Sequence, residues 1–192
     1  VITCGVARKP GQSRLDLAQT NVNILKAVAK EVVPHAPNAT YIIVSNPVDI
    51  LTYTFHKYSD LPENKIIGSG TILDTSRLRF RLSEYYNINQ QNVHAYVLGE
   101  HGDSCMVPWS LANISNIPIQ EYGKAVQKSD KIYPDLSFQE VEEYVKKSGG
   151  RIISRKGATF YAVSISVCHI CKRLLSGIDT TMTVSTMLHG EY

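Results

Sequence analysis

Three short strand-like segments in the first 68 residues constrain this chain more than any other feature. They are residues 1–4 (VITC), 41–44 (YIIV) and 66–67 (II), and the expected strands are apolar on both faces. Between them, residues 15–32 carry apolar side chains at steps of three and four up to Pro34, and residues 49–58 favour a second helix. Strands buried on both faces and separated by helices predict a parallel sheet covered by helices.

The pattern changes after residue 70. Helices are expected over residues 73–86, 136–148 and 158–176, and strands over residues 93–97 and 183–187. Gly149 and Gly150 are expected to bend or end the second of these helices, and residues 99–135 are rich in turns. The chain therefore predicts an α/β part followed by an α+β part, with a boundary near Gly68–Gly70.

Composition excludes several classes of protein. A net charge of +3 over 192 residues is too small and too dispersed to indicate a nucleic-acid partner. No apolar run exceeds four residues, so no membrane span is expected. Four cysteines, two of them in the Cys168–Cys171 CxxC, indicate neither a disulfide framework nor a complete zinc site, and they point to a reducing, cytoplasmic location.

Ligands of open parallel sheets bind beyond the carboxyl ends of the strands. Three segments fall at such ends: residues 6–14, 45–47 (SNP) and 68–70 (GSG). The GSG segment is more typical of a turn, because no GxGxxG spacing accompanies it.

A second group of residues could carry acid–base chemistry. Asp74 and Arg77 are three residues apart on an expected helix and so share a face. His101 stands between glycines in residues 99–103 (GEHGD). A carboxylate could orient this histidine as a proton carrier, and an arginine could hold a substrate carboxylate with two hydrogen bonds. A lone histidine is more often a surface or core residue, and spacing alone does not bring residue 74 next to residue 101.

The order of these motifs resembles the lactate/malate dehydrogenase family. The resemblance is carried, along essentially the whole chain, by residues 5–15 (GVARKPGQSRL), 45–53 (SNPVDILTY), 68–77 (GSGTILDTSR), 99–104 (GEHGDS), 156–159 (KGAT) and 183–187 (TVSTM). It implies an α/β fold in which residues 1–68 are the C-terminal part of a Rossmann-type NAD-binding domain. Residues 69–192 would form an α+β catalytic domain that is incomplete at its C-terminus. It also implies an internal fragment, with the GxGxxG segment and the ribose-binding acid expected before Val1.

The resemblance implies NAD as the cofactor and a role for each matching residue. His101 would be the acid/base, Asp74 would hold its imidazole, and Arg14, on a mobile loop, would polarise the substrate carbonyl. Asn46 would lie where nicotinamide and substrate meet. The implied substrate-binding residues are Arg8, Arg14, Asn46, Arg77 and Thr159, and the implied cofactor-binding residues are Thr3, Gly5, Val44, Asn46 and Val163.

The substrate is the point on which the motifs disagree. Arg8 matches the malate branch, in which an arginine pairs with the second carboxylate of oxaloacetate, although some bacterial enzymes of the lactate branch also carry it. Glu100 in GEHGDS, the NPVDILTY segment and Thr159 in KGAT resemble the lactate branch. Interconversion of L-lactate and pyruvate is therefore the expected reaction, with malate and oxaloacetate as the alternative.

The resemblance also implies regulation and assembly. Arg79 and His94 match positions that bind fructose 1,6-bisphosphate at a subunit interface in bacterial members, and a homotetramer is expected. Two readings from other classes remain: an inactive scaffold, and a metal hydrolase that uses His94, Glu100, His101 and Asp103. An inactive scaffold would not require the acid–base residues that this chain retains. The residues of the metal hydrolase match no compact zinc spacing. The choice between NAD and NADP stays open.

Overall fold

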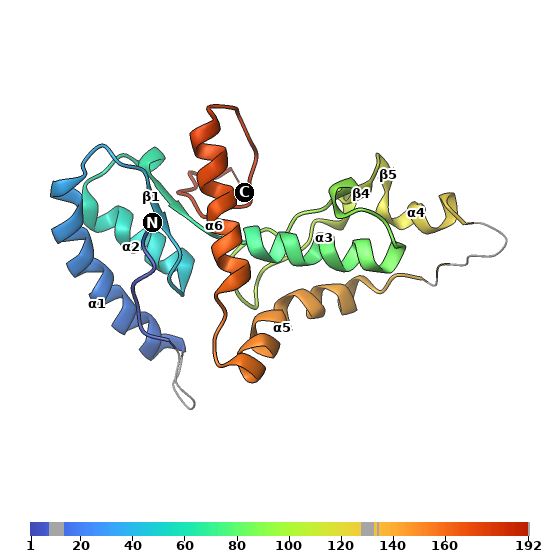
Figure 1. The fold of residues 1–192 in the computed structure, drawn as a ribbon, viewed down its shortest axis with the longest axis horizontal. Helices are drawn as coiled ribbons and strands as arrows, with labels where there is room; N and C mark the ends of the chain where they lie inside the picture. Colours follow the sequence, from blue (N-terminus) through green and yellow to red (C-terminus); the bar gives the residue numbers. More distant parts are fainter. Residues whose placement is uncertain (8–13, 128–132, 134, 192) are drawn as a thin grey trace. The chain divides into compact units, whose positions relative to one another are not determined.

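The computed structural model describes residues 1–7, 14–127, 133 and 135–191, with the side chains of residues 14–16 outside this description. Its chain divides into two compact units (Figure 1). The first comprises Val1–Gly70, Arg173–Ile178 and Val184–Tyr192, and the second comprises Thr71–Lys172 and Asp179–Thr183. Within the described residues, no helix is both long and apolar enough to cross a bilayer.

The first unit contains the parallel sheet that the sequence predicts. Its β1 and β2 pair in parallel, with Tyr41 opposite Ile66 and Ile43 opposite Gly68. Ile2 lies parallel to Ile43 on the other edge of β1, so the expected first strand is reduced to a single bridge. The elements of this unit are α1 (Arg14–Val32), η1 (Val33–His35), β1 (Tyr41–Ile43), α2 (Val48–Ser59), η2 (Glu63–Lys65) and β2 (Ile66–Gly68).

The two helices of the first unit pack against each other and against the sheet. Leu25 and Ala29, four residues apart on α1, are almost completely buried, and so are Leu51 and Phe55 on α2. These side chains form one apolar cluster with Ile43 of β1. Pro34 lies at the start of η1, where the α-helix has already ended. The apolar stripe therefore forms the buried face of α1, and the helix ends before Pro34, as predicted.

The segment 184–192 returns to the first unit. Gly68 and Ser185 exchange two backbone hydrogen bonds of 2.9 and 3.0 Å, which form one antiparallel bridge. The strand expected over residues 183–187 is therefore wrong in extent. Gly70 has a φ of +51°, and a Cβ there would lie 2.6 Å from the backbone nitrogen of Ser185. The GSG segment is thus a close approach of two backbones.

The second unit combines helices with a small antiparallel sheet in the order β3–β4–β5. Its elements are α3 (Ile72–Tyr86), η3 (Gln90–Asn92), β3 (Val93–His94), η4 (Trp109–Leu111), β4 (Asn113–Ile114), β5 (Ile117–Pro118), α4 (Ile119–Ala125), α5 (Phe138–Lys156) and α6 (Tyr161–Ser176), which runs on into the first unit from Arg173. Helix α5 runs alongside α3 (Figure 1). Leu78 and Leu82 of α3 pack with Val145 of α5 in the core.

Two expectations for the second unit are corrected. The strand expected over residues 93–97 ends at His94, because the backbone groups of Ala95 and Val97 bond side chains of α3 and of its N-cap residue instead of a neighbouring strand. Helix α5 also does not end at Gly149–Gly150. It continues to Lys156, and Gly157, with a φ of +78°, provides its C-cap.

Candidate active site

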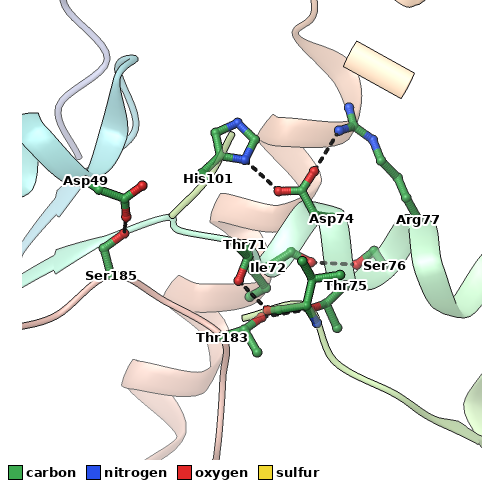
Figure 2. Close-up of polar contacts among 11 residues, drawn as sticks. Asp49, Thr71, Ile72, Asp74, Thr75, Ser76, Arg77, His101, Thr183 and Ser185 are labelled. Carbon is green, nitrogen blue, oxygen red and sulfur yellow. Dashed lines mark hydrogen bonds and ion pairs between the residues drawn. The ribbon is translucent and has the colours of Figure 1, made fainter. Parts of the chain in front are cut away.

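One carboxylate in the second unit binds two nitrogen-bearing side chains (Figure 2). His101 Nδ1 lies 2.5 Å from Asp74 Oδ2, and Arg77 Nη1 lies 3.1 Å from Asp74 Oδ1. The Asp74 side chain is only 6% exposed, whereas that of His101 is 29% exposed. The structure thus brings together the three residues that the sequence motifs suggest for acid–base chemistry and carboxylate binding.

Helix α3 and one loop supply this cluster. Asp74 and Arg77 lie three residues apart near the start of α3, so the ion pair follows from the helix geometry. His101 lies in the loop between Leu98 and Met106, whose backbones exchange two hydrogen bonds of 2.9 Å each. Within the loop, the Ser104 hydroxyl donates a hydrogen bond of 2.8 Å to a neighbouring carboxylate, that of Glu100. The histidine is therefore carried by a loop that is closed at its base.

The arrangement fixes how His101 can act. An ionised carboxylate only accepts hydrogen bonds, so Nδ1 of His101 must carry the proton that Asp74 accepts. Proton exchange with another molecule is then assigned to Nε2. The cluster can work as a general acid or base. Among the described residues, no group of three or more His, Cys, Asp or Glu side chains could hold a metal ion.

A pocket of about 550 Å³ lies beside this cluster in the second unit. Arg77 lines it from α3, and Thr159 and Val163 line it from the segment around the start of α6. Its further cations are Arg151, Arg155 and Lys156 of α5. Lys156 belongs to the KGAT segment, but sequence reasoning did not single out Arg151 and Arg155. Arg151 donates to the Tyr144 carbonyl at 2.7 Å and so is bound to α5 itself.

The first unit holds the other group of predicted positions. Thr3, Gly5 and Asn46 are exposed and Val44 is half-buried, all beyond or near the carboxyl ends of the Ile2 segment and β1. The buried Asn21 of α1, which sequence reasoning missed, joins the two loops. Its Oδ1 accepts from the Val6 N–H at 2.7 Å, and its Nδ2 donates to the Asn46 carbonyl at 2.8 Å. A polar residue inside an apolar helix stripe was the available signal.

The cysteines contribute no further site. All four lie in the described part of the chain as free thiols; Cys168 is exposed on α6 and Cys171 is half-buried. Cys105 is buried near the base of the His101 loop, and its burial, followed by the charge of Asp74, raises the pKa of its thiol.

Comparison with known proteins identifies the family. Residues 1–68 match the model of the lactate/malate dehydrogenase NAD binding domain, and residues 71–192 match that of the lactate/malate dehydrogenase alpha/beta C-terminal domain. The chain belongs to the lactate/malate dehydrogenase family. The resemblance drawn from the sequence motifs is therefore confirmed, and so is the α/β fold class.

Individual relatives agree with this membership. The chain is 46% identical to L-lactate dehydrogenase 1 of Clostridium acetobutylicum and 45% identical to L-lactate dehydrogenase of Clostridium perfringens. In both comparisons all of this chain is covered, and it spans 60% of the relative's length. A crystal structure of the minor L-lactate dehydrogenase from Enterococcus mundtii, in a ligands-bound form, matches 98% of this chain and 59% of its own, with 38% identity and a TM-score of 0.88.

The remaining positions expected from the family are placed as follows. Arg8 lies outside the described residues, and Arg14 is the first residue of α1, with its side chain outside the description. Arg79 of α3 donates from Nε to the Ala95 carbonyl at 2.9 Å, and its guanidinium lies 4.7 Å from the centre of the Tyr96 ring. His94, on β3, is exposed and directly precedes Ala95 in the chain. The fold thus brings Arg79 to the segment that carries His94.

Proposed function

We propose that this chain supplies the acid–base and substrate-binding residues of an NAD-dependent L-lactate dehydrogenase, which interconverts L-lactate and pyruvate. The observation that carries the proposal is Asp74, whose two carboxylate oxygens bind His101 and Arg77. Family membership and the names of the relatives support the reaction class. A cluster with one proton carrier and one cation is what oxidation of a 2-hydroxy acid requires.

His101 is assigned the proton transfer. When the hydroxyl of lactate is oxidised, Nε2 of His101 takes its proton, and in the reverse direction Nε2 returns it to the carbonyl oxygen of pyruvate. The bond from Nδ1 to Asp74 holds the ring and stabilises the imidazolium that forms. General acid–base catalysis of this kind contributes about 100- to 10,000-fold in rate.

Arg77 is assigned the substrate carboxylate. Its Nη1 is bonded to Asp74, but a guanidinium has five N–H donors, so the same side chain can also bind a carboxylate. Thr159 lines the same pocket and would form a wall beside the substrate. Arg14 is assigned the polarisation of the carbonyl, and this role rests on the resemblance of its sequence segment alone.

NAD would supply the hydride acceptor, and the residues expected to hold it are compatible with a bound nucleotide. Thr3, Gly5 and Asn46 are exposed, as contact with a ligand requires. At Gly5, a Cβ would approach Asn21 Oδ1 to 3.2 Å, so the absence of a side chain keeps this loop close to α1. Val44 is assigned to the cofactor together with them, and the assignment of Val163 to the cofactor rests on the family resemblance alone.

The substrate is tested by a specificity ratio. We expect a larger kcat/KM for pyruvate than for oxaloacetate in the complete protein, and a further shift toward pyruvate in Arg8→Gln, which lacks the cation that a second carboxylate would bind. A larger kcat/KM for oxaloacetate in the parent would reassign the protein to malate. No turnover of either substrate with NADH would favour the inactive scaffold, and unchanged activity in a chelator would exclude the metal hydrolase.

Regulation and assembly are also proposed from the family resemblance. Arg79 keeps further N–H donors beyond the one that Ala95 accepts, so Arg79 and His94 could bind a phosphate together. Fructose 1,6-bisphosphate is the proposed effector, and activity that is indifferent to it between about pH 5 and 8, the range in which histidine titrates, would refute this. A homotetramer is expected, and sedimentation at several concentrations would measure it. The free cysteines support the proposed cytoplasmic location.

A further inference from the structure

The backbone of Val97 is held by two threonine side chains at the start of α3. Thr71 donates from its hydroxyl to the Val97 carbonyl at 2.6 Å, and Thr75 accepts from the Val97 N–H at 2.9 Å. Val97 is 1% exposed, and the two threonines are 4% and 6% exposed. Both backbone groups of one buried residue are therefore bonded to side chains of a single helix and its cap.

Thr71 makes this bond in place of its usual role. It occupies the N-cap position of α3, where a threonine hydroxyl commonly accepts from a backbone N–H of the first turn. No such capping bond is present at Thr71, whose hydroxyl instead reaches Val97. The hydroxyl thus fixes a segment that is 26 residues away in the sequence rather than its own helix end.

Thr75 is itself held by a third hydroxyl. Its Oγ1 lies 3.0 Å from Oγ1 of Thr183 (Figure 2). Because Thr75 accepts the bond from Val97, its own hydroxyl proton can be donated to Thr183. Donation to Thr183 would leave a lone pair of the Thr75 oxygen facing the Val97 N–H.

The two threonines that make these bonds flank Asp74 in the sequence. Asp74 is the neighbour of Thr75 on α3, and Val97 comes immediately before the loop that carries His101 and is closed by Leu98 and Met106. We propose that Thr75, together with Thr71, positions His101 against Asp74 by fixing the start of this loop on α3. The inference rests on the proposed function for its effect on catalysis, but the positioning itself can be measured without activity.

The test compares Thr75→Val, which keeps the β-branched shape and removes the hydroxyl, with Thr75→Ser, which keeps the hydroxyl. In the complete protein, the His101 Nδ1 proton is followed by NMR, because a short bond to a carboxylate moves such a proton downfield. We expect this resonance to move upfield or broaden in Thr75→Val and to be kept in Thr75→Ser. The kcat/KM for pyruvate should fall about 10- to 100-fold in Thr75→Val, mainly through kcat, because Arg77 remains on α3.

Thr54→Val is the matched control. Thr54 is equally buried, and its hydroxyl bonds the Ile50 carbonyl within α2, far along the chain from the His101 loop. The proposal predicts an unchanged resonance there. An unchanged resonance in Thr75→Val would overturn the proposal, and if that variant does not fold, the same measurement on Thr71→Val decides. Absence of pyruvate turnover in the parent would overturn the proposed function alone, since the NMR result stands without it.

Discussion

Replacing Asp74 with Asn tests the assignment of His101 most directly. The amide has the shape of the carboxylate but offers one oxygen and one NH₂ group. If the oxygen stays toward Arg77, the NH₂ group faces His101 Nδ1, which must then accept and leave its proton on Nε2. If the amide turns over, its NH₂ group faces the N–H groups of Arg77. The first arrangement leaves Nε2 protonated, so it cannot take a proton from the substrate. The second keeps Nε2 unprotonated but sets two donor groups against each other at Arg77.

The size of the effect follows from the bond that is lost. The bond between Asp74 and His101 is 2.5 Å long and largely buried, so it belongs to the charge-assisted class. Such bonds contribute about 1.5–3 kcal/mol, which corresponds to roughly 10- to 150-fold in rate. Holding the wrong tautomer adds to this loss, as it does in other histidine–aspartate pairs, so we expect kcat/KM to fall by about 100- to 10,000-fold.

The assay is the initial rate of NADH oxidation with pyruvate over a range of concentrations. Glu84→Gln is the matched control on the same helix, since Glu84 is exposed and lies 3.9 Å from Arg81. Thermal unfolding of each variant separates a loss of chemistry from a loss of structure. If Asp74→Asn kept its kcat/KM within about threefold of the parent, less than about 1 kcal/mol, the role given to the Asp74–His101 bond would be refuted.

Three further predictions concern stability. Gly70→Ala should lower the free energy of unfolding by about 2 kcal/mol or more, because of the positive φ and the nearby Ser185 backbone, whereas Gly149→Ala, with open space around it, should raise it by about 0.5–1 kcal/mol. Leu78→Ala should cost about 2–5 kcal/mol, since Leu78 is fully buried; urea unfolding measures all three variants, and a cost under about 1 kcal/mol for Leu78→Ala would contradict its place in the core. Burial raises the pKa of Tyr86 from 10.0 to about 12 in the folded protein. Between these two values the phenol ionises in the unfolded chain but stays neutral in the folded protein. Stability is therefore unaffected below about pH 10 and falls above it. Tyr86→Phe should make this alkaline loss of stability shallower, and an unchanged slope would contradict the assignment.

The helices could be predicted from the sequence better than the strands. Residues 15–32 and 73–86 were expected to be helical, and α1 and α3 differ from them by one residue at the first end. Apolar periodicity reports a helix because its backbone bonds are internal. A strand depends on a backbone partner elsewhere in the chain. The segments around Ile2 and Ser185 form only single bridges, and the carbonyl of Ala95 bonds a side chain instead of another strand. The hydrophobic pattern of a segment does not say which backbone partner that segment will have.

The candidate site likewise has a part that local spacing predicts and a part that it does not, and α3 shows the reason. The pair of Asp74 and Arg77 follows from a spacing of three, but Asp74 and His101 are 27 residues apart and were connected only by the family resemblance. One buried stripe of α3 and its cap, at steps of three and four residues, starts with Thr71, Asp74 and Thr75 and continues with Leu78 and Leu82. Buried polar groups cost free energy unless they are bonded, so a helix whose core-facing stripe turns polar at one end must have partners there. In α3 those partners are the start of the His101 loop and His101 itself, which makes the apolar half of the helix the part that holds the core and the polar half the part that holds the site.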